Sequence, residues 1–457
     1  MGKKFDFDYV VIGSGAAGST AALMAAGAGL KVALIEEKEW GGSNLNTRDI
    51  PYAAGLHFSH LYAEAVRGAR FGLSSANLRY NYPTAVHWQT VAAKRAGAGS
   101  AKEFEDAGIK CIKGYAHFIN PFELAIGEKG NISAKKFLIA TGSQTAAGGI
   151  AGLENTKCLT PTSALVVNRI PKVVLIVGAG ATGCEIAQYY AELGSKVLLA
   201  ELANRILPQE DAEVGELMEH YLTKQLKVKV LTESRVTTVA KDRVSKKVIF
   251  MRGGQEKQVR VEEIILATGS APATDLGLEN AGVKYTKMGI KVEPTLQTSA
   301  KHIYAAGDVL GGNKSSTEKA SYEAAVATAN IVNRAKNAVD YRGFVRMVNT
   351  FPPVASVGLT EDDCLKRDLK YKSTIVLLNT TSASNTSDFR AGFIKLIANR
   401  ERRIIGATVV APQADLIIQE IVLAMRNRIS VVELASTPHV AMSWSELVRI
   451  AARRLSR

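Results

Sequence analysis

The stretch that decides the fold is DYVVIGSGAAG, residues 8–18. It contains a short apolar run suited to a buried strand, and this run leads into a Gly-x-Gly-x-x-Gly turn. An alanine-rich stretch at 19–28 favours a helix, and a second apolar run at 31–35 ends at Glu36, 23 residues after Gly13. The order predicts a strand, a glycine turn, a helix and a second strand.

Each glycine of this turn has a distinct task in a dinucleotide site. Gly13 permits the tight turn, Gly15 lets the backbone approach a pyrophosphate, and Gly18 lets the helix pack closely on the strand. The helix N-terminus presents unpaired N–H groups to the phosphates. Glu36, at the end of the second strand, is placed to accept hydrogen bonds from ribose hydroxyls. We therefore predict a first dinucleotide site here.

The same unit recurs at residues 172–201. Its glycines are Gly178, Gly180 and Gly183, and its acidic strand end is Glu201, again 23 residues after the first glycine. Two units on one chain predict two bound dinucleotides. Glu201 would repel a 2′-phosphate, which favours NADH over NADPH, and the cation of Arg205 nearby would soften that preference.

Three shorter pieces follow the two glycine turns. Residues 137–143 and 264–270 are each an apolar strand followed by Ala-Thr-Gly-Ser, and residues 302–308 form a strand that ends in Gly-Asp. We expect these pieces to close the nucleotide-binding units. Within these pieces we expect Thr141, Gly142 and Gly269 at the cofactors, and the third piece ends at Asp308.

Composition excludes several other classes of protein. The 457 residues suffice for about three domains, and 47% hydrophobic with 22% charged residues is ordinary for a globular protein. The formal charge of +14 is spread without long basic blocks, so we expect no nucleic-acid partner and no contact with a membrane surface. The four cysteines are far apart, which predicts neither a metal site nor a disulfide scaffold. With no long apolar run and no signal peptide, we expect a soluble, cytoplasmic protein.

The order of these motifs resembles the flavin-dependent pyridine nucleotide–disulfide oxidoreductases, such as dihydrolipoamide dehydrogenase, mercuric reductase and soluble transhydrogenase. The resemblance spans the whole chain and implies FAD at the first unit, with Asp308 on the FAD chain. It implies a nicotinamide nucleotide at the second unit, with Glu185 near the nicotinamide. Residues 351–360 (FPPVASVGLT) and 392–398 (GFIKLIA) resemble the family's dimerisation domain, which implies a homodimer.

The expected fold is therefore α/β, with two Rossmann-like dinucleotide-binding domains and a carboxyl-terminal α+β dimerisation domain. We expect the FAD domain at 1–150 and 271–340. The inserted NAD domain is expected at 151–270 and the dimerisation domain at 341–457.

The segment that carries the family's redox cysteines departs from the family pattern. Gly42 and Ser43, which we expect at the cofactor, open a stretch in which the family places two cysteines separated by four residues. Here Asn44 and Asp49 stand at those two positions. The lysine that the family pairs with Glu185 is replaced by Ala53, which predicts that Glu185 lacks its ionic partner.

The carboxyl-terminal acid–base motif departs as well. Ala441 stands where the family has its catalytic histidine, although Glu446 keeps the matching carboxylate. His439 lies two residues earlier, and we expect it to be a structural residue. None of the four cysteines lies in a redox motif, and Cys184 is expected to be a packing residue.

These departures favour a FAD-dependent NAD(P)H oxidoreductase that passes electrons directly to a small acceptor, such as a quinone, oxygen, a nicotinamide nucleotide or a dye. In this interpretation Glu185 positions the nicotinamide, while Asp49 and Asn44 lie at the flavin, with Arg48 available to neutralise Asp49. No metal is expected. The alternative is a redox-impaired flavin-binding pseudoenzyme that acts as a scaffold or sensor.

Overall fold

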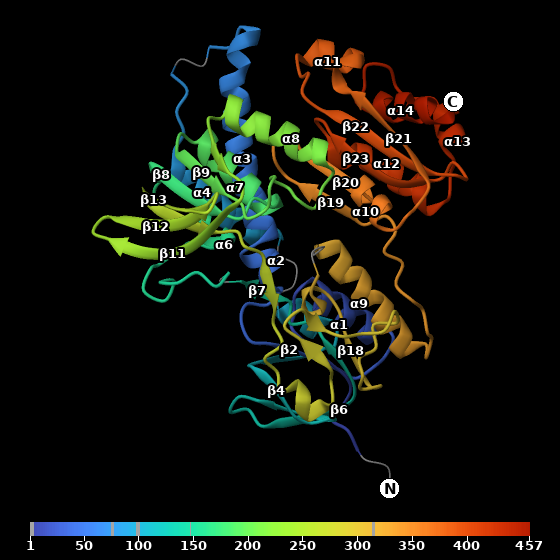
Figure 1. Cartoon of the computed structure of the whole chain (residues 1–457). Helices are drawn as coiled ribbons and strands as arrows, with labels where there is room; N and C mark the ends of the chain where they lie inside the picture. The colour runs from blue at the N-terminus through green and yellow to red at the C-terminus, as the bar shows by residue number, and fades with distance from the viewer. Residues whose placement is uncertain (1–3, 75–76, 97–100, 147, 313–315) are drawn as a thin grey trace. The chain divides into compact units, whose positions relative to one another are not determined.

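The computed structural model describes residues 4–74, 77–96, 101–146, 148–312 and 316–457. The chain divides into two compact units (Figure 1). The first unit comprises 1–55, 83–146 and 269–340, and the second comprises 56–82, 147–268 and 341–457.

A mostly parallel sheet forms the centre of the first unit. Its strand order is β3-β2-β1-β6-β5-β4, and β18 pairs with β6. The pairings among β3, β2, β1, β6 and β18 are parallel, whereas β4 and β5 pair in antiparallel fashion. The bounds are β1 (Phe7–Ile12), β2 (Val32–Glu36), β3 (Lys110–Lys113), β4 (Ala116–Asn120), β5 (Glu123–Ile126), β6 (Asn131–Ile139) and β18 (Ile303–Ala305).

The apolar run of β1 is continuous because both faces of this sheet are covered. Tyr9 and Val11 pack in one core with α1 (Ala16–Gly27) and α9 (Thr317–Val332), while Val10 and Ile12 belong to a second core on the other face. Alternate residues of a strand point to opposite faces, so each core needs its own set of apolar side chains.

The second unit contains the other parallel sheet, in the order β10-β9-β8-β14, together with the meander β11-β12-β13. Helix α7 (Ala181–Glu192) follows β8 directly. The strand bounds are β8 (Val173–Val177), β9 (Lys196–Ala200), β10 (Lys229–Leu231), β11 (Ser234–Asp242), β12 (Ser245–Arg252), β13 (Gln255–Val261) and β14 (Glu263–Leu266).

The carboxyl-terminal part of the second unit is a five-stranded antiparallel sheet packed with helices, drawn in orange and red in Figure 1. The strand order is β19-β20-β23-β22-β21. The bounds are β19 (Val345–Val348), β20 (Val354–Gly358), β21 (Tyr371–Leu377), β22 (Phe393–Asn399), β23 (Ile404–Val410), α12 (Ala414–Arg426), α13 (Val431–Ser436) and α14 (Glu446–Ser456).

Shorter and connecting elements complete the chain. The helices are α2 (Gly42–Asn46), α3 (Asp49–Arg67), α4 (Tyr82–Ala96), α5 (Ala101–Asp106), α6 (Pro161–Ala164), α8 (Ala212–His220), α10 (Glu361–Lys366) and α11 (Ser382–Ser387). The short strands are β7 (Ser143–Thr145), β15 (Ser270–Pro272), β16 (Tyr285–Thr286) and β17 (Gly289–Ile290).

The α/β class predicted from the sequence is confirmed. Helix α14 buries Leu447, Val448 and Leu455 in the core of the carboxyl-terminal sheet. The first helix begins at Ala16, three residues before the predicted start, because Gly15 inside the glycine turn is already its N-cap. Within the described residues, none of the helices combines the length and apolar character needed to cross a membrane. The division into three domains stays a prediction.

Candidate functional site

The first glycine turn joins β1 to α1 and depends on glycine at two places. Gly13 has φ of 97°, and its N–H donates to the carbonyl of Ile35 at 2.8 Å, which ties the turn to β2. A Cβ added at Gly18 would meet the carbonyl oxygen of Gly13 at 1.7 Å, so helix and turn touch through backbone alone. The close packing predicted for Gly18 is therefore present.

Glu36 is fixed beside this turn. Its Oε2 accepts from the Ser14 N–H at 2.9 Å and from the Ser14 hydroxyl at 2.7 Å, and its Oε1 accepts from the Lys38 N–H at 2.7 Å. The side chain is buried at 8% exposure. The carboxylate is thus oriented at the end of β2, where the sequence predicts ribose hydroxyls to bind.

The second turn, between β8 and α7, repeats the same geometry in the second unit. Gly178 has φ of 99° and donates to the Ala200 carbonyl at 2.8 Å, and a Cβ at Gly183 would meet the Gly178 oxygen at 1.9 Å. Glu201 accepts from the Ala179 N–H at 2.6 Å and from the Ala203 N–H at 2.9 Å. Two stretches far apart in sequence have therefore folded into matching turns.

Both turns are suited to an anion. Gly15 and Gly180 are the N-caps of α1 and α7, and as glycines they have no side chain to accept from the first-turn N–H groups. A Cβ added at either glycine would meet no protein atom within 4 Å. The backbone at each helix N-terminus can therefore be approached closely, and the first-turn N–H groups of a helix are suited to bind a pyrophosphate. FAD at the first turn and a nicotinamide nucleotide at the second fit these residues.

The other predicted cofactor residues of the first unit have defined contacts, and Gly42 lies beside the glycine turn. A Cβ on Gly42 would lie 2.6 Å from the Cα of Gly15, so the start of α2, which holds Ser43, lies against the turn. The hydroxyl of Thr141 donates to the Ala273 carbonyl at 2.7 Å, and the carbonyl of Gly142 accepts from Ala273. Gly269 has φ of 95° and accepts from the Ala146 N–H at the start of β15.

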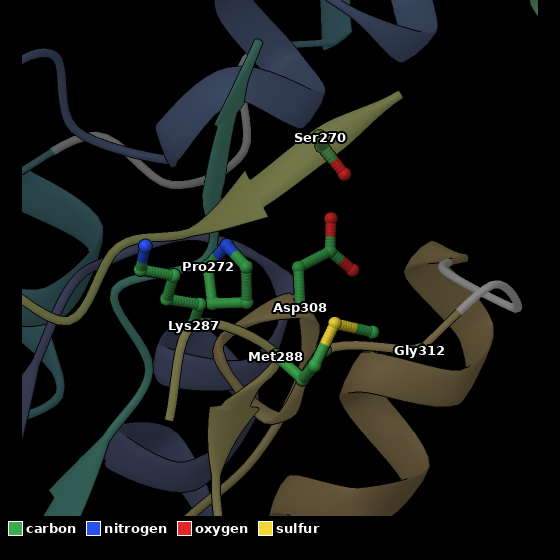
Figure 2. A pocket seen from close by; sticks show the side chains of 7 residues that line it. Ser270, Pro272, Lys287, Met288, Asp308 and Gly312 are labelled. Atoms are coloured by element: carbon green, nitrogen blue, oxygen red, sulfur yellow. The ribbon is translucent and has the colours of Figure 1, made fainter. Parts of the chain in front are cut away.

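Asp308 borders a cavity of about 70 Å³ in the first unit. Figure 2 shows its carboxylate directed toward Ser270, with Lys287 and Met288 from the preceding hairpin also at the cavity. The Ser143 hydroxyl donates to Asp308 Oδ2 at 2.9 Å, and Arg48 Nη1 lies 3.4 Å from the same oxygen. Arg48 therefore pairs with Asp308 and not, as considered from the sequence, with Asp49.

Asp49 has a partner that the sequence does not reveal. It begins α3, and the Thr317 hydroxyl, in the first turn of α9, donates to its carboxylate. Asn44 lies half-buried in α2. The hydrogen bond from Thr317 holds the Asp49 carboxylate at the N-terminus of α9.

Glu185 of α7 also has partners that sequence reasoning missed. Its Oε1 accepts from the Asn349 N–H at 2.6 Å and from the Asn349 side-chain amide at 3.0 Å, and the residue is only 4% exposed. One turn further along α7, Gln188 exchanges two hydrogen bonds with the backbone of Phe351. The neutral Asn349 thus holds the Glu185 carboxylate, and the predicted loss of the ionic partner through the exchange to Ala53 stays a prediction.

Both ring nitrogens of His439 have hydrogen-bond partners. Nδ1 lies 2.9 Å from the Thr437 carbonyl and Nε2 lies 2.8 Å from Glu420 Oε1, with the side chain 4% exposed. Both ring nitrogens are therefore engaged within the protomer, and the structural interpretation of His439 stays a prediction. Glu446 accepts from the Met442 N–H at 3.2 Å and supports the turn before α14.

Taken together, these features define a class: an oxidoreductase that binds two dinucleotides on one chain. Residues 7–339 match the family described as pyridine nucleotide-disulphide oxidoreductase, and residues 344–452 match its dimerisation domain. The chain belongs to this family. Membership supports binding of FAD and a pyridine nucleotide, and the dimerisation domain supports a homodimer.

Individual relatives cover nearly the whole chain. Mitochondrial dihydrolipoyl dehydrogenase 2 of Arabidopsis thaliana is 31% identical over 98% of this chain and 90% of its own length. A mercuric reductase of Bacillus cereus is 30% identical over 98% of this chain and 71% of its own length. The crystal structure of LpdA from Mycobacterium tuberculosis has a TM-score of 0.87 at 26% identity, covering 98% of this chain and 99% of LpdA.

Proposed function

We propose that this protein is a FAD-dependent NAD(P)H oxidoreductase that delivers electrons directly to a small acceptor and does not exchange thiols with disulfides. Quinones, oxygen, nicotinamide nucleotides and dyes are the candidate acceptors, and the proposed location is the cytoplasm. FAD supplies the redox chemistry when bound, because its isoalloxazine ring carries two electrons without a protein thiol.

The observation that carries this proposal is the segment 41–53. It keeps the paired glycines and the proline of the family's redox segment, yet it presents Asn44 and Asp49 where two cysteines are expected. Thiol–disulfide exchange requires a thiolate nucleophile. Neither an amide nor a carboxylate can attack a disulfide sulfur and form the mixed disulfide.

The four thiols elsewhere are poorly suited to replace that pair. All four are free, and burial is the leading cause that raises each pKa, reaching about 11 for Cys111. Cys184 is fully buried and donates to the Ala179 carbonyl at 3.4 Å. A thiol reacts as its thiolate, so these groups stay protonated and inert near neutral pH.

The chain's remaining polar groups serve binding and positioning in this proposal. The N-termini of α1 and α7 bind the two pyrophosphates, and Glu36 and Glu201 bind adenosine ribose hydroxyls. Glu185, held by Asn349, positions the nicotinamide. Glu201 repels a 2′-phosphate, so NADH is the proposed donor. Asp49 adds a negative charge beside α9, which disfavours an anionic reduced flavin by like-charge repulsion.

Alkylation with iodoacetamide at pH 7 tests the thiol part of the proposal. We expect NADH-dependent dye reduction to be unchanged, because no thiol takes part, and we expect no turnover of lipoamide, glutathione disulfide or mercuric ion. Modification should rise as the pH approaches the raised thiol pKa values, with Cys111 reacting near pH 11. Loss of dye reduction in proportion to alkylation at pH 7 would contradict the proposal.

A further inference from the structure

The loop that follows Glu201 is anchored to the carboxyl-terminal sheet of the same unit. At its end, Glu210 forms two bonds with Arg346, Nε to Oε1 at 2.9 Å and Nη2 to Oε2 at 3.0 Å, with both side chains at most 13% exposed. The next residue, Asp211, accepts from the Lys395 ammonium at 3.1 Å and from the Thr408 hydroxyl at 3.1 Å. The loop from Glu201 to Asp211 is therefore fixed at its far end.

Arg205 lies within this loop, four residues after Glu201, and its guanidinium is already engaged. Nη2 lies 3.1 Å from the Glu210 carbonyl and 3.4 Å from the Pro208 carbonyl. The same nitrogen lies 3.2 Å from Oδ2 of Asp362, a residue 157 positions away in the sequence. These contacts hold the Arg205 side chain in place. They do not enclose it, because 28% of the side chain stays exposed.

Asp362 is itself held in a defined place. It lies in the first turn of α10, and the start of that helix is fixed by a capping box between Thr360 and Asp363. The neighbouring Glu361 reaches the buried Lys395 at 2.5 Å. The Asp362 carboxylate thus faces Arg205 from a rigid helix start, although its own side chain is 52% exposed.

These contacts bear on the choice between NADH and NADPH. A 2′-phosphate beside Glu201 needs a cation to offset that carboxylate, and Arg205 is the cation on the same loop. We propose that Asp362 is a positioning residue for nucleotide selectivity: it keeps Arg205 on the loop carbonyls, away from a 2′-phosphate, and so preserves the preference for NADH. This inference rests on the proposed use of NADH at the second glycine turn.

The charge-removing, shape-conserving variant Asp362→Asn tests it directly. Calorimetric titration of the FAD-loaded protein with NAD⁺ and NADP⁺ gives the ratio of the two dissociation constants without needing turnover. We expect Asp362→Asn to shift this ratio toward NADP⁺ by about threefold to fivefold, the factor that corresponds to one partly exposed ion pair. The rates of flavin reduction by NADH and NADPH should shift in the same direction.

Two further variants distinguish the positioning of Arg205 by Asp362 from a general effect of removing a negative charge or of disturbing the structure. Asp368→Asn removes the same charge just past α10 and should leave the ratio unchanged. In the double variant Asp362→Asn with Arg205→Ala, the gain for NADP⁺ should vanish, because the gain comes from Arg205. An unchanged ratio in Asp362→Asn, or a gain that survives loss of Arg205, would overturn the inference.

The same titration distinguishes this inference from the proposed function. If NAD⁺ binds more tightly than NADP⁺ and Asp362→Asn narrows the difference, the inference holds even where NADH fails to reduce the flavin. If the unmodified protein binds neither nucleotide, both fail together.

Discussion

Gly18 shows how the geometry of the proposed dinucleotide site depends on a single residue. Helix α1 can approach β1 only because Gly18 offers no side chain to the Gly13 carbonyl, and the tight turn in turn requires the positive φ of Gly13. A larger residue would push the helix N-terminus, and with it the phosphate-binding N–H groups, out of place.

We predict that Gly18→Ala lowers the free energy of unfolding by about 3 kcal/mol and reduces FAD content, because its Cβ overlaps backbone that cannot move aside. Gly27→Ala is the matched control on the same helix. A Cβ there meets nothing within 4 Å, so this exchange should be neutral or stabilise the fold by about 0.5 kcal/mol. Chemical denaturation and the ratio of flavin to protein absorbance measure both effects. Equal free energies of unfolding and equal FAD contents in the two variants would contradict the packing role of Gly18.

At the scale of the element, α7 is both the nucleotide-binding helix and the partner of the segment before β20. Glu185 and Gln188 lie one turn apart and bind the backbone of Asn349 and Phe351. This pairing sets the orientation of the Glu185 carboxylate, which we propose to lie near the nicotinamide.

We predict that Asn349→Ala slows flavin reduction by NADH about fivefold. It removes the hydrogen bond from the Asn349 side-chain amide to Glu185, worth about 1 kcal/mol, while the backbone N–H of residue 349 remains. Rapid-mixing absorbance under anaerobic conditions measures the rate. Asn399→Ala, at the half-buried end of β22, is a control that should leave the rate unchanged. If both variants reduce at the wild-type rate, Asn349 has no positioning role.

Local spacing explains which of these features could be predicted from the sequence. The glycine turns, their acidic strand ends and the strands around them follow from patterns within about thirty residues, so they could be predicted. The bonds from Thr317 to Asp49 and from Asn349 to Glu185 join residues 268 and 164 positions apart. Nothing in a local pattern marks such partners, because only the tertiary fold brings them together.

At the scale of the molecule, buried ion pairs join the second parallel sheet region to the carboxyl-terminal sheet. Lys395 of β22 is 1% exposed and lies within 3.1 Å of carboxylate oxygens of Asp211, Glu213 and Glu361. These three carboxylates cluster closely enough to suit a metal ion, but the lysine nitrogen lies among them and neutralises their charge. Its bonds to these carboxylates raise the Lys395 pKa despite burial.

We predict that Lys395→Met destabilises the protein by about 3–5 kcal/mol, because it leaves three carboxylates crowded without a cation. Lys372→Met, on the exposed side of neighbouring β21, should change stability by less than about 0.5 kcal/mol. Chemical denaturation at pH 7 and at pH 5 compares them. Although burial acts to raise it, the Glu361 pKa is lowered by its hydrogen bond to Lys395. Without Lys395 the Glu361 carboxylate should take up a proton at higher pH, so the penalty for Lys395→Met should shrink at pH 5. A small, pH-independent effect would contradict this account of the cluster.

The measurement that tests the central claim most directly is an anaerobic titration of the FAD-loaded protein with NADH, followed by absorbance. With Asn44 and Asp49 in place of two cysteines, the only redox group we propose is the flavin. The flavin absorbance should therefore be fully lost after two electrons per FAD, and the same endpoint should be reached after alkylation of the thiols. A four-electron endpoint that alkylation reduces to two would contradict the account, because it would place a redox-active thiol pair in the protein. Failure of NADH to reduce the flavin at all would also contradict it and would favour a flavin-binding scaffold or sensor.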